Sequence, residues 1–295
     1  MKKDLSVVIV SYNTKDLTLQ CISRLQTALS QGSLTAEIII IDNNSQDGSS
    51  EELKKIKDSE RIKVVCNTEN NGYGKANNQG LALAEGRYIL YLNSDVLVPE
   101  QPLFDYLVDE MDGHPLYGGL TVRVELAPGE IDQASHRGFP TVWRSLCYYI
   151  GAEKITAKIP ILNKIFGGYH LTYLSCATKH EIDSPTGAFF LIRGNLLTVL
   201  NGFDEDFFMY GEDIDLAFRI KRLGYSILYD PTYTVLHLKG QSGIYKTSDV
   251  SIQKKTRTYF FDSMAIFYKK HYENSYPRFI SSFVYAVINR KKTLL

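Results

Sequence analysis

Apolar and polar positions along the first hundred residues predict strands and helices in regular succession. Four short runs rich in β-branched residues are typical of strands covered on both faces of a sheet, and they lie at residues 5–10, 36–42, 61–66 and 87–92. Between these runs we expect helices at residues 15–30, in a charged segment ending near residue 57, and at residues 75–84. This alternation predicts an α/β fold with a mostly parallel central sheet and helices on both of its faces.

The pattern becomes less regular beyond Pro99. We expect a helix to about Met111 and a helix at 212–223, with strands at 117–125, 185–193, 225–229 and 233–238. Residues 139–182 carry prolines and aromatic residues in no regular pattern, and we interpret them as a largely helical insertion. This organisation predicts one domain over residues 1–250 and a helical extension over residues 251–295.

The extension differs from the rest of the chain in charge. The whole chain has a formal net charge of zero, which gives no reason to expect a nucleic-acid partner. Residues 254–295, in contrast, hold nine Lys or Arg against two Asp or Glu, and ten of them are Phe or Tyr. Two interpretations stay open. The segment forms a basic amphipathic helix that makes peripheral contact with a membrane, or it packs its aromatic residues on the main domain.

Hydropathy and cysteine usage bear on location. No stretch reaches the roughly 18–20 consecutive apolar residues of a membrane-spanning helix, so any membrane contact is expected to be peripheral. The four cysteines form no C-x-x-C pair, which favours a reducing compartment over a zinc cluster or a disulfide scaffold. We expect a cytoplasmic protein, with the inner face of the cytoplasmic membrane as the place of any such contact.

Polar residues follow the predicted strands at the points where they end. These clusters are Ser11-Tyr12-Asn13, Asp42-Asn43-Asn44-Ser45, Asn70-Asn71-Gly72 and Asn93-Ser94-Asp95. The carboxyl ends of parallel strands share one edge of a sheet, where ligands bind in open α/β folds. Amides and carboxylates there can hold a nucleobase and a ribose, and an aspartate can hold a divalent cation. Neither G-x-G-x-x-G nor a P-loop motif is present, so ordinary dinucleotide or P-loop binding is not expected.

The densest chemical signal is the segment from Gly202 to Leu216, which mixes acidic with aromatic residues. Glu212 and Asp213 follow Gly211 at a predicted helix start, where carboxylates are stabilised by free amides. A carboxylate beside apolar rings can act as a general base toward a hydroxyl group. Asp215 is expected to cap the same helix, and His237 ends a predicted strand further on.

Together these motifs resemble family 2 of the inverting glycosyltransferases, which have the GT-A fold, and in particular their bacterial rhamnosyltransferase-like branch. The resemblance covers residues 5–243 through S-Y-N, D-N-N-S, N-N-G-Y-G-K-A-N-N, L-N-S-D, G-A-F-F-L-I-R, G-F-D-E-D-F-F-M-Y-G-E-D-I-D-L and H-L-K-G-Q-S, in that order. It implies a Rossmann-like sheet and the transfer of one sugar, rhamnose by the branch. The donor would be a nucleotide diphosphate sugar, dTDP-rhamnose before UDP-sugars. We expect the acceptor to be a hydroxyl of a cell-surface glycan or a lipid-linked molecule; the lipid-linked acceptor is a hypothesis motivated by the basic aromatic extension alone, and we place acceptor contacts in the 139–182 insertion.

The resemblance also implies roles for single residues. The implied donor-binding residues are Ser11, Tyr12, Asn13, Asp42, Asn44, Asn71, Gly72, Asn78, Asn93, Ser94, Gly187 and Ala188. Asp95 and His237 are implied ligands of Mg²⁺ or Mn²⁺, although Asn93 stands where many members of the family carry Asp. Asp213 is implied as the catalytic base of a direct, inverting displacement, with Glu212 as the substitute candidate.

Other classes stay open beside this interpretation. A non-catalytic nucleotide-sugar binding protein would have no need of Asp213 and His237. A sugar nucleotidyltransferase would normally carry a glycine-rich basic loop after the first strand, where this chain has Ser11-Tyr-Asn-Thr-Lys15. Processive polysaccharide synthases carry a Q-x-x-R-W motif and several membrane spans. Neither is found in this sequence, so addition of a single sugar is favoured.

Overall fold

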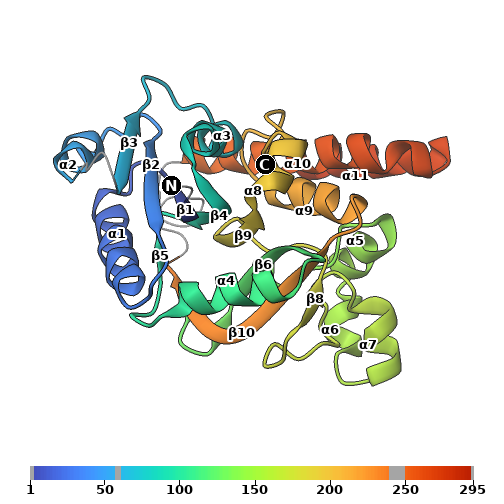
Figure 1. Ribbon diagram of the computed structural model, residues 1–295. Coiled ribbons are helices and arrows are strands. Elements are labelled where there is room, and N and C mark those ends of the chain that lie inside the picture. Colours follow the sequence, from blue (N-terminus) through green and yellow to red (C-terminus); the bar gives the residue numbers. More distant parts are fainter. Residues whose placement is uncertain (1–2, 57–60, 239–249, 294–295) are drawn as a thin grey trace.

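The structure, a computed structural model, describes residues 3–56, 61–238 and 250–293. Strand and helix alternate through its first part as predicted (Figure 1). The elements there are β1 (Lys3–Ser11), α1 (Lys15–Ser30), β2 (Ala36–Asp42), α2 (Ser49–Lys55), β3 (Ile62–Cys66), α3 (Tyr73–Leu83), β4 (Gly86–Asn93), β5 (Val96–Leu97) and α4 (Leu103–Gly113). The α/β class and a mostly parallel central sheet are therefore confirmed.

The later part of the chain adds strands to the same sheet and helices around it. Its elements are β6 (Tyr117–Ala127), β7 (Glu130–Ile131), η1 (Gln133–Ser135), α5 (Val142–Tyr149), α6 (Ala152–Thr156), α7 (Pro160–Phe166), β8 (His180–Ile182), β9 (Phe189–Arg193), α8 (Gly194–Leu200), α9 (Glu212–Arg222), β10 (Ser226–His237), α10 (Val250–His271), η2 (Glu273–Ser275) and α11 (Arg278–Thr293). Within the described residues, no helix combines the length and apolarity needed to span a bilayer.

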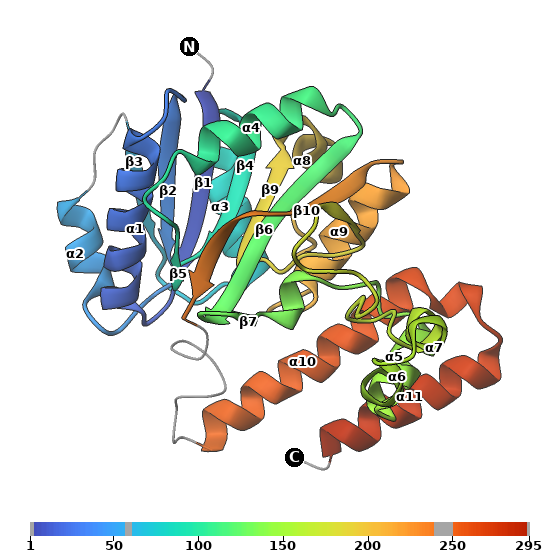
Figure 2. The ribbon, with the colours of Figure 1, turned by 90° about the horizontal axis from the view of Figure 1, so that it is seen from below.

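The sheet brings the polar strand ends together. Its strand order is β3-β2-β1-β4-β9-β6-β10-β5, and β3, β2, β1 and β4 run parallel. The register places Ser11 opposite Asp42 and Val10 opposite Asn93. Three predicted polar clusters therefore leave the sheet at one edge, on the side that faces α10 in Figure 2.

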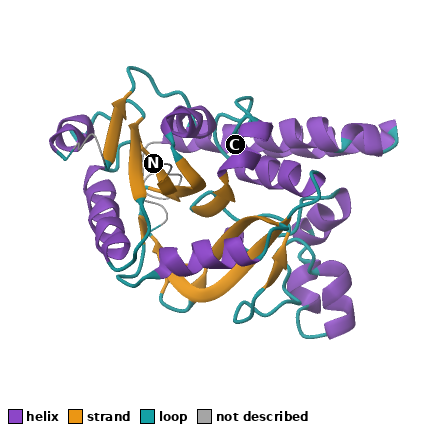
Figure 3. Cartoon of the chain, in the orientation of Figure 1, coloured by secondary structure: helices purple, strands orange, loops and turns teal. Residues whose placement is uncertain are grey.

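Alternate residues of each central strand enter separate cores, because successive side chains of a strand point to opposite faces. Val7 and Ile9 of β1 pack in the core formed with α1 and α4. Val8 packs in the core formed with α3, α8 and α9. Figure 3 shows these helices on both sides of the strands. The fully buried strands explain why the sequence reads as continuous apolar runs.

The prediction of two short strands at 225–229 and 233–238 was wrong. The chain forms a single strand, β10, which pairs with β6 and shifts register between Asp230 and Thr234. Pro231 has no N–H to donate to a neighbouring strand, and Thr232 N donates to Oδ1 of Asp230 instead. The polar turn residues thus mark a bulge inside one strand.

The insertion and the extension both contact the main domain. The insertion, helical in α5, α6 and α7, is anchored where Arg144 pairs with Asp183 at 2.6 Å. In the extension, Phe267 of α10 is 4% exposed and contacts the ring of Phe218 in α9. Helix α11 lies antiparallel to α10, as Figure 2 shows. The domain organisation expected from sequence otherwise stays a prediction.

Candidate active site

A cavity of about 150 Å³ lies at the carboxyl ends of the central strands. It is lined by Val10, Tyr12, Asn43, Asn70, Gly72, Tyr73, Asn93, Ser94, Asp95, Phe208 and Met209. The cavity therefore joins residues from the four strand-end clusters with the acidic and aromatic segment near residue 208. Among the residues expected to bind a donor or a metal, the structure brings Tyr12, Gly72, Asn93, Ser94 and Asp95 to this cavity.

The pairing of β5 with β10 carries His237 to Asp95. The two strands are antiparallel, with His237 opposite Val96, and Leu238 N donates to the carbonyl oxygen of Asp95 at 2.9 Å. As a result, Nε2 of His237 lies 3.3 Å from Oδ1 of Asp95. The rest of the histidine motif, residues 239–242, lies outside the described residues.

Asp132 holds the other nitrogen of this imidazole. Its Oδ2 lies 3.1 Å from Nδ1 of His237, while its Oδ1 accepts from the backbone N–H of Ala134 and so caps η1. Burial lowers the pKa of His237, but the hydrogen bonds to Asp132 and Asp95 outweigh burial and raise this pKa to about 9. The imidazole is thus fixed in orientation, with Nε2 directed at Asp95.

A chain of polar contacts links this pair to Asp213. Nδ2 of Asn93 lies 3.5 Å from Nε2 of His237, and Oδ1 of Asn93 accepts from the Tyr73 hydroxyl at 2.9 Å. The same hydroxyl lies 3.0 Å from the carbonyl oxygen of Gly187. The amide of Gly187 in turn donates to Oδ2 of Asp213 at 3.1 Å. Residues 95, 237 and 213 therefore belong to one connected polar site.

The two acidic residues at the start of α9 have different surroundings. Asp213 pairs with Arg137 through an Nη2–Oδ2 distance of 2.9 Å. Glu212 is 7% exposed, and its Oε2 is buried without a hydrogen-bond partner. Burial and the neighbouring charge of Asp213 raise the pKa of Glu212 to about 8. Near neutral pH Glu212 is therefore mostly protonated, beside the ion pair of Asp213 with Arg137.

Close backbone packing connects the Gly72 turn with the loop before α9. Gly72 has φ of +80°, and a Cβ there would lie 2.5 Å from the carbonyl oxygen of Phe208. That oxygen accepts from the N–H of Tyr73 at 2.9 Å. Only glycine fits both the backbone angle and the space, which explains the glycine at the start of α3.

Helix α10 supports the same loop from outside. Ser263 Oγ donates to the carbonyl oxygen of Met209 at 2.9 Å, and the rings of Phe208 and Tyr259 stack with centroids 4.5 Å apart. His271 lies 2.7 Å from Asp215. Asp215 was expected to cap α9, but its buried carboxylate contacts His271 and also Arg219, so the capping interpretation was wrong.

Several expected donor residues lie beside the cavity without lining it. Ser11 is fully buried and hydrogen-bonds Thr18 at 2.9 Å. The side chains of Asn13, Asn44 and Asn71 also bond to protein groups. Oδ1 of Asn13 accepts from the backbone N–H of Gln46, and Oδ1 of Asn44 accepts from Nε2 of Gln46. Nδ2 of Asn71 donates to the carbonyl oxygen of Glu69. The structure therefore occupies these four side chains with contacts to other protein groups, and donor contacts at these positions stay a prediction.

Asp42 and Ala188 are both fully buried and do not line the cavity. Oδ2 of Asp42 accepts from Ser50, but its Oδ1 is buried and has no partner. Buried polar atoms in folded proteins nearly always have a partner, so the unpartnered Oδ1 of Asp42 is an exception next to Asn43, which lines the cavity. Ala188 contributes its carbonyl oxygen, which accepts from the N–H of Asn93 at 3.1 Å.

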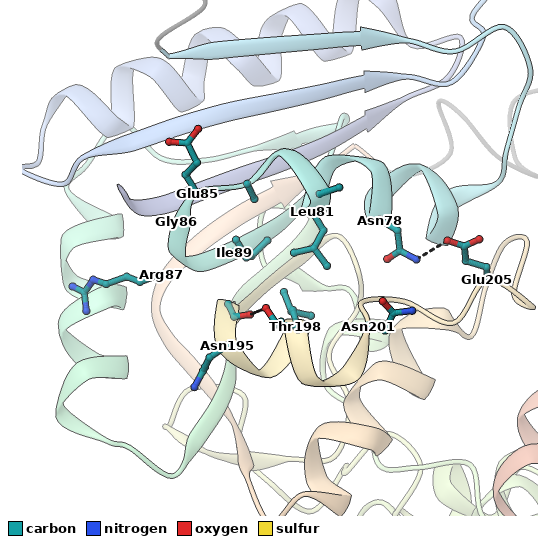
Figure 4. A pocket seen from close by; sticks show the side chains of 14 residues that line it. Asn78, Leu81, Glu85, Gly86, Arg87, Ile89, Asn195, Thr198, Asn201 and Glu205 are labelled. Atoms are coloured by element: carbon teal, nitrogen blue, oxygen red, sulfur yellow. Dashed lines mark hydrogen bonds between the residues drawn. The ribbon is translucent and has the colours of Figure 1, made fainter. Parts of the chain in front are cut away.

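Asn78 lies at a separate and larger cavity, of about 820 Å³, between α3 and α8 (Figure 4). Its amide donates to Glu205 at 3.0 Å and to the carbonyl oxygen of Phe203 at 2.9 Å. The structure therefore does not bring Asn78 to the strand-end site. Asn78 braces the loop that leads to Phe208.

Sequence reasoning missed Tyr73, Asp132 and Arg137 as parts of this site. Tyr73 stands inside the N-N-G-Y-G-K-A-N-N motif, directly after a glycine turn, and that position was a usable signal. Asp132 and Arg137 follow the short strand β7 and belong to no motif. Only the pairing of β7 with β6 and the bridge between Arg137 and Ser184 bring them to the site.

Asp95 and His237 are the residues that could hold a metal ion. Nowhere in the described ranges do three or more His, Cys, Asp or Glu side chains converge as a metal-binding group. A carboxylate oxygen and an imidazole nitrogen suit a divalent cation whose remaining ligands are water and substrate phosphate oxygens, and cation binding would displace the proton that His237 otherwise holds at Nε2. The contact from Asp132 to the far nitrogen of His237 is the usual way in which a ligating imidazole is oriented.

Comparison with known proteins agrees with this geometry. The model of the family described as Glycosyl transferase family 2 matches residues 6–176. A poly-beta-1,6-N-acetyl-D-glucosamine synthase of Staphylococcus aureus (strain COL) is 25% identical over 200 residues, which are 66% of this chain and 41% of that protein. The chain thus spans less than half the length of this curated relative.

Solved structures show the same fold. The mannosyltransferase PcManGT from Pyrobaculum calidifontis, in complex with GDP-Man and Mn²⁺, has a TM-score of 0.56 at 16% identity, covering 92% of this chain and 64% of that one. Residues 1–349 of S. aureus TarS, in complex with UDP-GlcNAc, have a TM-score of 0.54 at 19% identity, covering 89% and 65% of the two chains.

Proposed function

The chain belongs to glycosyltransferase family 2, and we propose that it transfers a single sugar from a nucleotide diphosphate donor to a hydroxyl group with inversion at the anomeric carbon. The observation that carries this proposal is the path of polar contacts from the Asp95–His237 pair through Asn93, Tyr73 and the Gly187 peptide to Asp213. A group that stabilises a leaving phosphate and a group that accepts a proton are thus connected across one site.

The donor nucleotide is proposed to lie along the strand-end cavity. Tyr12, 41% exposed, offers a ring for the base, and the unpartnered Oδ1 of Asp42 offers an acceptor for a donor hydroxyl or imide N–H. Asn93 and Ser94 can donate hydrogen bonds to the diphosphate. The small residues Gly187 and Ala188 leave room for the sugar beside Asp213.

The residue types at the phosphate side fit Mg²⁺ or Mn²⁺, with Asp95 and His237 as the protein ligands. When bound, such a cation supplies positive charge to the departing diphosphate. With Asn93 in place of a second carboxylate, the protein contributes one negative charge here. The donor diphosphate is therefore expected to be needed for tight cation binding.

Asp213 is proposed as the general base. It accepts the proton of the acceptor hydroxyl as that oxygen bonds to the anomeric carbon, and the bond from this carbon to the diphosphate oxygen breaks. Arg137 and the Gly187 amide hold Oδ2 of Asp213 in position. Glu212 is the substitute candidate. A single displacement with one base gives inversion, whereas retention would need a second displacement.

For the sugar, we propose L-rhamnose on dTDP as the first donor to test, because the motif order favours that branch. UDP-N-acetylglucosamine is the second, because TarS was solved with UDP-GlcNAc and a curated relative is named as a synthase of poly-beta-1,6-N-acetyl-D-glucosamine. The proposed acceptor is a cell-surface glycan or its lipid-linked precursor at the inner face of the cytoplasmic membrane.

Donor and metal can be tested by thermal unfolding with dTDP-, UDP- and GDP-sugars, each with and without Mn²⁺. A ligand that binds only the folded state raises the unfolding temperature in line with its affinity. We expect one nucleotide class to stabilise the protein, and to do so more strongly with Mn²⁺. Absence of any shift with every donor would contradict the proposal.

The catalytic role is tested with Asp213→Asn, with Asp109→Asn on the exposed face of α4 as the matched control. Transfer should fall by about 10²–10⁴-fold, the usual contribution of a general base, while the donor-induced thermal shift is kept. If Asp213→Asn lost transfer activity and the donor-induced thermal shift to the same extent, Asp213 would be assigned to donor binding. Unchanged transfer in Asp213→Asn with loss in Glu212→Gln would move the base to Glu212.

A further inference from the structure

Exposed apolar side chains gather on the insertion. Ten of the eighteen exposed large hydrophobic residues in the described chain lie between residues 143 and 165. They are Trp143, Leu146, Tyr148, Tyr149, Ile150, Ile155, Ile159, Ile161, Leu162 and Ile165. Ile155 and Ile161 are each 78% exposed. Monomeric soluble proteins rarely present such a concentration unless it serves an interaction.

The charges on this segment have one sign. Lys154, Lys158 and Lys164 are exposed, while the single acidic residue of the segment, Glu153, is 4% exposed. Its carboxylate is bound to the imidazole of His170 at 2.8 Å. The outer surface of α5, α6 and α7 therefore combines apolar side chains with lysines and presents no carboxylate to compete with them.

Helix α11 continues this surface. It contains no acidic residue and carries Arg278, Arg290, Lys291 and Lys292, and its Phe279 and Phe283 are 74% and 62% exposed. Lys291 lies over the ring of Tyr149, with Nζ 5.8 Å from the centroid. Figure 2, seen from below, shows α5, α6 and α7 over the α10–α11 pair. We name residues 143–165 and the exposed residues of α11 the basic apolar shoulder.

Helix α10, in contrast, directs many of its aromatic side chains inward. Phe267 and Tyr268 are 4% and 5% exposed, and Tyr259 stacks on Phe208 beside the site. Most aromatic side chains of residues 254–295 thus pack against other residues of the protein. The structure places the apolar surface that is left free mainly on the insertion.

We propose that the basic apolar shoulder is a docking surface for a bilayer that contains anionic lipids. Isoleucines and aromatic rings suit the boundary between headgroups and acyl chains, and lysines around them attract anionic headgroups. A symmetric contact with a second copy would instead bring the lysines of both copies together without carboxylates to pair them. The inference deepens the proposed function, because docking through the shoulder would present a lipid-linked acceptor to the site.

The single tryptophan makes the surface directly observable, since Trp143 lies on the shoulder and is 50% exposed. The full chain is mixed with vesicles of phosphatidylcholine alone or with about one third phosphatidylglycerol. We expect cosedimentation with the anionic vesicles, weakened by salt, and quenching of Trp143 emission by brominated phosphatidylcholine. Cosedimentation without quenching would overturn the proposal, because the tryptophan would then lie away from the acyl chains.

Variants separate the shoulder from non-specific adsorption. Ile155→Asp and Ile161→Asp should each weaken vesicle binding by about tenfold or more, as expected from the burial of one large apolar side chain. Leu116→Asp, at a position 71% exposed outside the shoulder, is the matched control and should bind like the unchanged protein. Replacement of any one of the exposed lysines by Gln should weaken binding to the anionic vesicles by about fivefold. Equal binding by all variants would refute the assignment.

Two further results would also refute it. One is a stable dimer that Ile161→Asp dissociates, in a protein that binds no vesicle. The other is capture of an acidic protein by the shoulder with no affinity for lipid. Vesicle binding needs no donor, and transfer to a soluble acceptor needs no vesicle. Loss of one with retention of the other therefore shows whether the docking surface or the proposed function has failed.

Discussion

Nδ1 of His237 lies 3.1 Å from Oδ2 of Asp132, although the two residues are 105 positions apart and Asp132 belongs to no recognisable motif. The contact leaves Nε2 of the imidazole directed at Asp95. Asp132 is therefore a positioning residue, which acts on the proposed metal and diphosphate through the orientation of His237.

Asp132→Asn tests this role. The amide keeps the size of the side chain but holds the imidazole less strongly, so Mn²⁺ affinity in the presence of donor should fall by about 10–100-fold, the usual effect of removing an outer partner of a ligating histidine. Titration of Mn²⁺ followed by thermal shift measures the affinity without requiring transfer. An unchanged Mn²⁺ affinity would show that Asp132 only caps η1.

Glu212 makes a pH-dependent contribution to stability. Its folded-state pKa of about 8 lies above the ordinary value of 4.5, so the unfolded chain releases this proton more readily. Stability is therefore lost as the pH rises from about 4.5 to about 8, by an amount on the order of a few kcal/mol. Glu212→Gln cannot ionise and should unfold at a higher temperature than the unchanged protein at pH 8.5, with little difference at pH 5.

His237 changes stability in the same direction, because its stabilising interactions are present below pH 6.5 and are lost as the pH rises through about 9. This effect is common to both proteins and cancels in the comparison of Glu212→Gln with the unchanged chain. If the unfolding temperatures of Glu212→Gln and of the unchanged protein differed by the same amount at every pH from 5 to 8.5, the carboxyl of Glu212 would not be held in its neutral form.

Tyr73 connects the two halves of the site through its hydroxyl group. Tyr73→Phe leaves the side-chain oxygen of Asn93 and the carbonyl oxygen of Gly187 without this donor. A buried unsatisfied group costs about 1–3 kcal/mol, so we expect a lower unfolding temperature and weaker donor binding. Tyr233→Phe, which removes a hydroxyl on the other side of the sheet, is the control. Donor binding equal in both variants would exclude a linking role for Tyr73.

Phe267 shows how far α10 belongs to the folded domain. Its ring is 4% exposed and contacts Phe218, His271 and Tyr272. Phe267→Ala should lower the free energy of unfolding by about 3–5 kcal/mol, measured by urea titration. Phe279→Ala, 74% exposed on α11, should change it by no more than about 0.5 kcal/mol.

The same packing affects any test by truncation. Removing residues after 250 would expose the loop that carries Phe208 and Met209, so loss of membrane binding in a truncated chain could reflect unfolding. If the truncated chain unfolded at the same temperature as the full chain, α10 would have no part in stabilising the domain.

The alternation of apolar strands and amphipathic helices determined the α/β class, the strand ends as the place of the site, and the acidic pair at the start of α9. Those features can be predicted from short stretches of sequence, because a continuous apolar run indicates a buried strand and the residues around a helix start indicate where the helix begins. The register of β1 with β2 and β4 then made the strand ends meet as expected.

Only the tertiary structure decided which polar residues face the cavity. Ser11, Asn13, Asn44 and Asn71 are residue types common in ligand-binding turns, yet their side chains bond to other protein groups: Ser11 to Thr18, Asn13 and Asn44 to Gln46, and Asn71 to Glu69. Asp132 and Arg137 reach the site through the pairing of β7 with β6 and the bridge of Arg137 to Ser184, and Asp132 then contacts His237, 105 positions away. Such contacts depend on how distant strands align, and no local pattern records that alignment.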